Sequence, residues 1–175
     1  MKKETLLLLA AIVVLPFVVR PAIASEIWIF AIFGLGLNLL LGYTGLLSFG
    51  QSTFFGSAAY VAGWLLKNYA INVFFALGIG VGVGAVSALL VGYLCVQRSG
   101  LYFIMLTFAL NQLFFFIAYQ WTSVTGGEDG MPGVPRPELL GLDFKDPLNY
   151  YAFVSVIFLL FFYWMKRIVE SPLGK

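Results

Sequence analysis

The sequence predicts an all-α protein that crosses a membrane several times as a bundle of helices. Of its 175 residues, 61% are hydrophobic and only 10% are charged. A soluble domain carries about 25% charged and about 45–50% apolar residues, so a soluble fold could not bury this much apolar surface. The apolar residues also form segments of membrane-spanning length. We therefore expect a polytopic transmembrane helix bundle.

Six segments are long and apolar enough to be membrane segments, because a spanning helix needs roughly 20 mainly apolar residues and a bundle tolerates shorter ones. The whole chain, residues 1–175, is then expected to form one transmembrane domain. The six segments are residues 5–20, 27–47, 52–67, 72–96, 101–120 and 149–167.

The first segment has two interpretations. Lys2 and Lys3 precede an apolar run, as in a secretory signal peptide, and Ala22-Ile23-Ala24 is a weak candidate for a cleavage site. Because more spans follow, a retained first helix is favoured over cleavage. The sequence alone leaves the cleavage of residues 1–24 open.

The second and third segments are joined by an unusually polar stretch, NLLLGYTGLLSFGQSTFFGSAAY, at residues 38–60. In lipid, polar side chains and freed backbone groups need partners inside the protein or in a water-lined cavity. Glycines here favour a re-entrant break or a kink within residues 42–52. The polar side chains line a solute path or bind neighbouring helices. They are Asn38, Tyr43, Thr44, Ser48, Gln51 and Ser52.

The fourth and fifth segments carry small and polar residues at helical spacing. Gly78, Gly80, Gly82 and Gly84 form overlapping small-x-x-x-small pairs, which let helix backbones approach closely and predict helix packing. In the fifth segment, Thr107 and Asn111 are four residues apart and share a helix face, with Gln112 beside them. These three either line the pathway or bind helices together. The eight candidate pathway residues are Asn38, Tyr43, Ser48, Gln51, Ser52, Thr107, Asn111 and Gln112.

The long polar stretch at residues 120–149 is rich in proline and glycine, which argues against a continuous helix. With the N-terminus inside and one crossing per segment, this loop is external, and both termini are cytoplasmic. It is either a connector or a lid or docking surface. Six of the ten Lys and Arg residues then lie inside, as the positive-inside rule favours. They are Lys2, Lys3, Arg98, Lys166, Arg167 and Lys175.

The absence of certain residue types limits the function. No charged residue lies near the middle of a proposed span, and the chain has no histidine, which excludes an imidazole zinc or haem site and weakens a proton-coupled antiporter. Neither a catalytic constellation nor a nucleotide-binding motif is present, so energy for transport would come from another chain. The net charge of +2 is too small to suggest nucleic acid. No cofactor or metal is expected.

Three blocks in order carry a family resemblance. GLNLLLGYTGLLSFGQSTFFGSAAY (36–60) strongly resembles the signature of bacterial ABC-importer permeases for branched-chain amino acids, especially their M-type subunit. SGLYFIMLTFALNQLFF (99–115) resembles the family's helix after its R-x-R-G-x-Y-F turn. WTSVTGGEDGMPGVP (121–135) resembles its external loop, with Thr125, Gly126, Gly127 and Gly130 at the motif positions.

The chain departs from the family pattern in two motifs and in length. It has Gln51-Ser52 where His-Ala or Gln-Ala is common, and Glu128-Asp129 where small polar residues are usual. Family members are nearly twice as long, so the resemblance implies a permease truncated after its first half. In the family, a short motif leads into the segment that couples to the ATPase, and SPLGK at residues 171–175 resembles it. The residues at the motif positions are Ser171, Pro172, Gly174 and Lys175.

The resemblance implies a permease subunit of an ATP-binding-cassette importer in the bacterial cytoplasmic membrane, which is not itself an enzyme. Its implied solutes are leucine, isoleucine and valine, with selectivity mainly in a binding protein. The implied partners are ATPase subunits, a second homologous permease and an extracytoplasmic solute-binding protein, all within membrane lipid. Alternatives are a permease for urea, short amides or another small polar solute, a non-transporting membrane fragment, and an energy-independent channel or secondary carrier.

Overall fold

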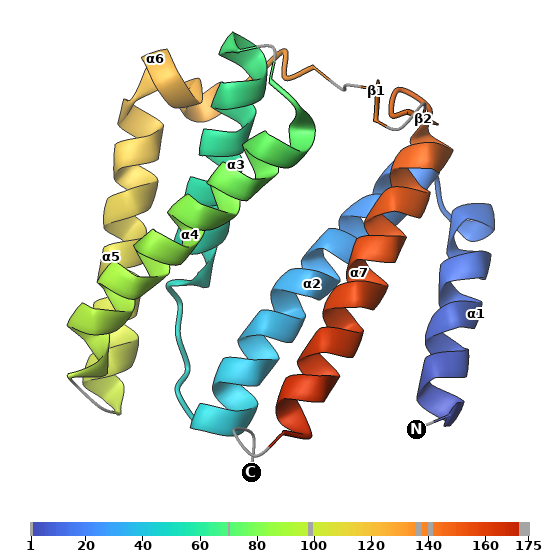
Figure 1. Ribbon diagram of the computed structural model, residues 1–175. Helices are drawn as coiled ribbons and strands as arrows, with labels where there is room; N and C mark the ends of the chain where they lie inside the picture. The colour runs from blue at the N-terminus through green and yellow to red at the C-terminus, as the bar shows by residue number, and fades with distance from the viewer. Residues whose placement is uncertain (1, 70, 98–99, 136–137, 140–141, 172–175) are drawn as a thin grey trace. The chain divides into compact units, whose positions relative to one another are not determined.

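The residues that the computed structural model describes form helices, apart from connecting segments and two short strands. It describes residues 2–69, 71–97, 100–135, 138–139 and 142–171. Each of the six predicted segments contains a helix, which confirms the prediction of an all-α helix bundle, although the helix of the second segment ends at Thr44 and not at residue 47 (Figure 1). The long helices are α1 (Lys2–Val18), α2 (Pro21–Thr44), α3 (Gln51–Asn68), α4 (Val73–Val96), α5 (Leu101–Gln120) and α7 (Pro147–Val169).

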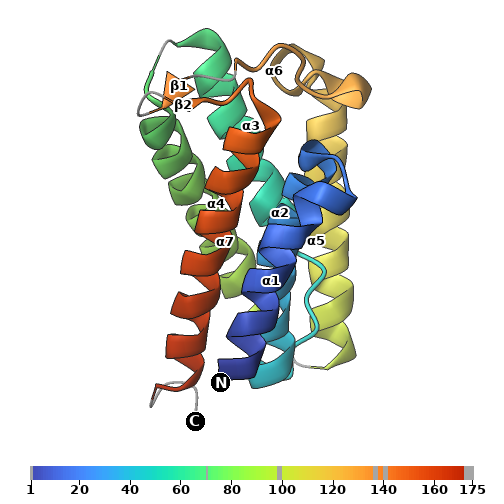
Figure 2. The same ribbon diagram turned by 90° about the vertical axis from the view of Figure 1, so that its right-hand side faces the viewer.

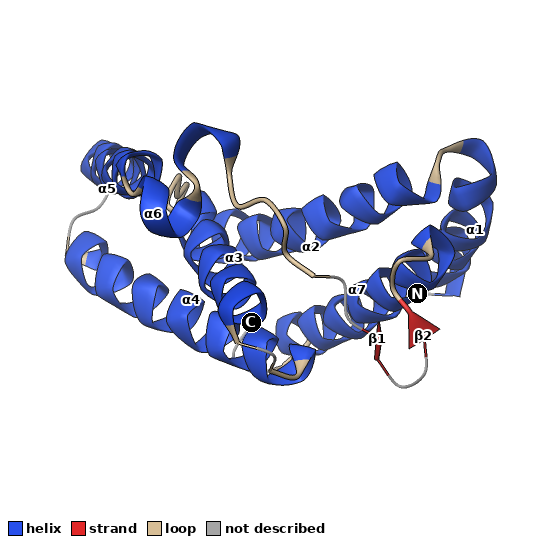
Figure 3. Cartoon of the chain, turned by 90° about the horizontal axis from the view of Figure 1, so that it is seen from above, coloured by secondary structure: helices blue, strands red, loops and turns tan. Residues whose placement is uncertain are grey.

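The stretch between α5 and α7 has only short elements, as its prolines and glycines predict. It contains the single-turn helix α6 (Thr122–Thr125) and the 3₁₀ turn η1 (Gly127–Asp129). Two antiparallel strands follow, β1 (Glu138–Leu139) and β2 (Leu142–Asp143), drawn in red in Figure 3.

Among the described residues, four helices are individually long and apolar enough to cross a membrane, which makes this a multi-pass membrane protein. A shorter apolar helix, Leu8–Val18, lies within α1. Helix α3 is not one of the four, because its polar residues, above all Gln51, Lys67 and Asn68, lower its mean hydropathy. The four are Pro21–Tyr43, Val73–Val96, Leu101–Gln120 and Pro147–Val169.

Local sequence explains where several helices begin. Helix α2 starts at Pro21, earlier than the predicted residue 27, because proline needs no hydrogen-bond partner in the first turn. Asn72 caps α4 by accepting from the Phe74 backbone N–H at 3.1 Å. Asp146 caps α7 by accepting from the Leu148 N–H, also at 3.1 Å.

Contacts divide the chain into two compact units. Unit 1 is Met1–Leu39 with Arg136–Lys175, and unit 2 is Leu40–Pro135.

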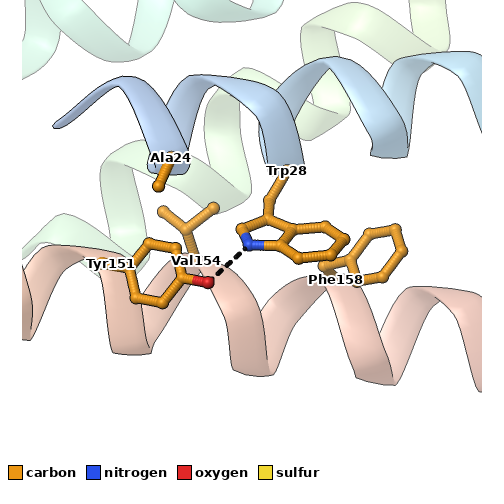
Figure 4. Packing of buried hydrophobic residues seen from close by; sticks show 5 residues of the cluster. All are labelled: Ala24, Trp28, Tyr151, Val154 and Phe158. Carbon is orange, nitrogen blue, oxygen red and sulfur yellow. Dashed lines mark hydrogen bonds between the residues drawn. The ribbon is translucent and has the colours of Figure 1, made fainter. Parts of the chain in front are cut away.

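The core of unit 1 is an aromatic cluster between α2 and α7 (Figure 4). Trp28 lies 4.5 Å from Phe158 between ring centroids, and both side chains are buried. Ala24 of α2 and Tyr151 of α7 lie at one end of the cluster, and Trp28 of α2 and Phe158 of α7 lie at the other end (Figure 4). The two helices therefore run parallel here. Figure 2 shows α1 running in the opposite direction to α7. The cluster consists of Ala24, Trp28, Tyr151, Val154 and Phe158.

Unit 2 is built on a close antiparallel pair, α3 and α4. A Cβ added at Gly80 would lie 2.8 Å from the Ala58 carbonyl oxygen and 3.1 Å from Ala62 Cβ. A Cβ added at Gly84 would lie 3.2 Å from Ala58 Cβ and 3.2 Å from the Phe54 carbonyl oxygen. Missing side chains at these two glycines therefore let the backbones of α3 and α4 approach closely.

Gly78 and Gly82 lie on a different side of α4, where an added Cβ meets no described atom within 4 Å.

We expect Gly80→Ala to lower the free energy of unfolding by about 1–3 kcal/mol, since its methyl group must displace the α3 backbone. Gly78→Ala is the matched control, and we expect no loss of stability from it. Detergent-solubilised variants can be unfolded with SDS and followed by circular dichroism; equal destabilisation would contradict the assigned packing.

Candidate functional site

The polar stretch between α2 and α3 contains a true break in helical structure. Helix α2 ends at Thr44, and α3 begins at Gln51, with residues 45–50 outside both helices. Gly45 has φ = +67°, in the left-handed region that glycine adopts without steric cost. The buried Gly50 N–H donates to Ser48 Oγ at 3.2 Å, which satisfies a backbone group freed by the break. The structure shows an interrupted helix here and not a continuous kinked one, while a re-entrant course of residues 42–52 stays a prediction.

The break ends beside the middle of α5. The Phe49 backbone N–H donates to Thr107 Oγ1 at 3.3 Å, and the Thr107 hydroxyl donates to the Ile104 carbonyl oxygen at 3.0 Å. Thr107 is only 1% exposed. Since α5 spans Leu101–Gln120, helix α3 begins near the mid-depth of a membrane-spanning helix.

One turn further along α5, Asn111 receives two hydrogen bonds from the start of α3. The hydroxyls of Ser52 and Thr53 donate to Asn111 Oδ1 at 2.8 Å and 2.9 Å. The sequence predicted candidate residues in both segments, and the fold brings Ser48, Ser52, Thr107 and Asn111 to one region. These contacts satisfy polar groups that lipid could not.

Sequence analysis missed three hydroxyl residues of this region. Thr53 and Ser87 are buried, and Ser57 Oγ lies 3.3 Å from Ser87 Oγ, joining α3 to α4. Helical spacing could have indicated Ser87, because Gly80, Gly84 and Ser87 share one face of α4. We call the complete set the polar cluster. It consists of Ser48, Ser52, Thr53, Ser57, Ser87, Thr107 and Asn111.

The other four predicted pathway residues are not part of the polar cluster. Asn38 belongs to unit 1, and Tyr43 is 52% exposed at the end of α2. Gln51 is half-buried and Gln112 is exposed. Among the described residues of unit 2, no hydrogen bond joins Tyr43, Gln51 or Gln112 to the polar cluster. The pathway role of these three residues and of Asn38 stays a prediction.

A shallow depression of about 360 Å³ lies at the end of α5. Its lining contains none of the predicted pathway residues, and one of its four side chains is polar. We assign it no role in the pathway. It is lined by Phe116, Ile117, Gln120 and Trp121.

The glycine-rich loop after α5 folds into a compact cap. The buried Thr125 hydroxyl lies 2.5 Å from the Ala118 carbonyl oxygen and 2.8 Å from that of Trp121, and it accepts from the Gly127 N–H at 3.2 Å. Gly126, Gly127 and Gly130 have φ values of +83°, +65° and +70°. The loop is therefore tied to the end of α5 by side-chain and backbone contacts.

The same loop reaches α3. A Cβ added at Gly63 would lie 3.4 Å from Met131 Sδ and 3.6 Å from Val134. Tyr119 donates from its hydroxyl to Glu128 Oε2 at 3.2 Å, which fixes the acidic side chain beside α5. These contacts join the loop to both α3 and α5.

At the other end of the chain, Ser171 donates to the Ile168 carbonyl oxygen at 2.6 Å and closes the last turn of α7. The remaining residues predicted to approach an ATPase, Pro172, Gly174 and Lys175, lie outside the described residues.

Comparison with known proteins identifies the family. A family model described as the branched-chain amino acid transport system / permease component matches residues 21–175. The chain belongs to this permease family. The predicted resemblance is thus confirmed, and the matched residues include the break, the polar cluster and the loop, while α1 precedes them.

Two curated relatives of the permease family support the M-type assignment. They are the high-affinity branched-chain amino acid transport system permease proteins LivM of Salmonella typhimurium and of Escherichia coli. Each is 27% identical over 202 residues, covering 99% of this chain and 48% of the relative. The chain therefore spans about half the length of these relatives. No solved structure matches it.

Proposed function

We propose that this chain forms part of the membrane-spanning permease of an ATP-binding-cassette importer for leucine, isoleucine and valine. Membership of the permease family carries this proposal. The relatives named for this transport are matched along nearly the whole chain, although it spans about half their length.

The polar cluster suits the passage of such a solute. A branched-chain amino acid is a zwitterion with an apolar side chain, and a path for it should be weakly polar without binding tightly. The cluster supplies hydroxyl groups and one amide, without a carboxylate or an amine. Its position beside the start of a broken helix resembles sites in other transporters, where backbone groups freed by a break meet the solute.

The proposed partners follow from the importer class. ATPase subunits would supply the energy, a second homologous permease would complete the membrane part, and a solute-binding protein would deliver the amino acid. We place the protein in the bacterial cytoplasmic membrane with both termini inside. The basic last turn of α7, with Lys166 and Arg167, supports this orientation.

A reconstitution experiment tests the function. The chain is co-expressed with the ATPase, the second permease and the binding protein, whose genes we expect beside its own. A further polypeptide supplies the part of the LivM sequence that this chain does not cover. We expect co-purification and ATP-dependent leucine uptake into proteoliposomes. Uptake of urea or a short amide instead of leucine would favour the alternative solutes, and failure of the ATPase to co-purify would favour a non-transporting fragment.

The role of the polar cluster has its own test in that reconstituted complex. Asn111→Leu removes the acceptor shared by Ser52 and Thr53. We expect leucine uptake to fall about tenfold, equivalent to about 1.4 kcal/mol. Gln112→Leu, at the neighbouring exposed position, tests whether Gln112 also contributes. Unchanged leucine uptake by the Asn111→Leu variant would show that the polar cluster is not part of the solute pathway.

A further inference from the structure

The first helix contains a proline that leaves a backbone carbonyl without its usual partner. Pro16 lies inside α1 and has no N–H, so the carbonyl oxygen of Ile12, four residues earlier, receives no intrahelical hydrogen bond there. In a membrane, such a carbonyl must be satisfied by another part of the protein.

Tyr151 of α7 satisfies this carbonyl. Its hydroxyl donates to the Ile12 carbonyl oxygen at 2.7 Å. It accepts from Trp28 Nε1 at 3.0 Å, the bond that Figure 4 draws as a dashed line. Tyr151 is 4% exposed. A single buried hydroxyl therefore links α1, α2 and α7, and its proton and an acceptor site are both used.

One face of α1 is packed against this region and the other is not. The packed residues recur at spacings of three and four, as one helical face requires. On the other face, Val13 is 63% exposed and Phe17 is 87% exposed. The α1 residues packed against the aromatic cluster are Leu8, Ala11, Ile12 and Leu15.

We propose that the face of α2 and α7 around Tyr151 is a docking site for a proline-containing apolar helix, and that α1 occupies it. Tyr151 is the positioning residue, because its hydroxyl replaces the donor that Pro16 lacks. The family model begins at residue 21, after α1, whereas the alignments with the two LivM relatives cover 99% of this chain and so take in α1. The docked α1 belongs to the mature protein.

A double-mutant cycle with Tyr151→Phe and Pro16→Ala tests the proposal. Tyr151→Phe removes the donor to Ile12, whereas Pro16→Ala restores a backbone N–H four residues after Ile12. The chain is given a protease site at residues 19–20, cleaved in detergent, and the loss of α1 from the rest is followed over time. We expect Tyr151→Phe to speed this loss about tenfold in the wild-type background.

In the Pro16→Ala background, most of that acceleration should disappear, since Ile12 then has a partner within its own helix. The lost Trp28 bond affects both backgrounds equally and cancels in the cycle. Tyr163→Phe, at a position of α7 that is 68% exposed, controls for loss of a hydroxyl and should leave the rate unchanged.

Equal acceleration by Tyr151→Phe in the two backgrounds would overturn the proposal, because the effect would then not pass through the Ile12 carbonyl. Mass spectrometry of the mature chain provides an independent test: a mass lacking α1 would also overturn it. Neither measurement depends on transport, so failure here is distinct from failure of the proposed function.

Discussion

Replacing Trp28 with alanine is expected to lower the free energy of unfolding of unit 1 by about 3–5 kcal/mol, the usual cost of emptying a buried aromatic site. Trp28 is 6% exposed, packs on Phe158 and donates to Tyr151. The substitution therefore creates a cavity and removes a hydrogen bond between α2 and α7. Unfolding in mixed detergent micelles, followed by circular dichroism, measures the loss.

Trp164→Ala is the matched control for this prediction. Trp164 lies on α7 of the same unit but is 58% exposed, so its removal leaves no cavity in the aromatic cluster. We expect a change within about 0.5 kcal/mol. A third variant, Trp28→Phe, keeps an aromatic ring without the N–H and should cost less than Trp28→Ala. Similar losses for Trp28→Ala and Trp164→Ala would show that the cluster is not the core of unit 1.

Gly126→Ala is expected to unfold the loop that caps α5. Gly126 has φ = +83°, a conformation that costs a residue with a side chain about 1–3 kcal/mol. In addition, an alanine Cβ would overlap the Gly130 carbonyl oxygen, so the backbone of the loop must move. Glutamyl endopeptidase should then cleave after the exposed Glu128 at least tenfold faster than in the wild type, a change of about 1.4 kcal/mol.

Gly133→Ala separates the conformational cost of a positive φ from the cost of overlap with a neighbouring backbone atom. Gly133 has φ = +77°, but a Cβ added there meets no described atom within 4 Å. This variant carries the conformational cost without the overlap, so we expect a smaller increase in cleavage. If both variants were cleaved at the same rate, the close approach of Gly126 and Gly130 would not control the loop.

The membrane character and the helical segments could be predicted because they depend on local sequence. A run of apolar residues such as those of α4 favours a membrane helix whatever its neighbours are. The break near Gly45 was also predictable as a region, since glycines and hydroxyl residues are unusual in a simple span. The start of α2 was less predictable, because Pro21 at the first helical position decides it.

The contacts of the site could not be predicted to the same degree. The sequence placed Asn111 and Ser52 among the candidates, but it did not pair them, and it missed Thr53 and Ser87. Nor did the glycine repeat reveal that Gly80 and Gly84 face α3 while Gly78 and Gly82 do not, because all four fit the same small-x-x-x-small pattern.

By itself, the sequence determined that this is a multi-pass helical membrane protein and indicated its permease family through three ordered motifs. The tertiary structure decided which polar groups pair: Phe49 with Thr107 across 58 residues, and Ile12 with Tyr151 across 139. The physical reason is the range of the interactions. Helix formation in lipid satisfies backbone groups within a segment, whereas a carbonyl freed by proline or an N–H freed by a break finds its partner only after distant helices pack.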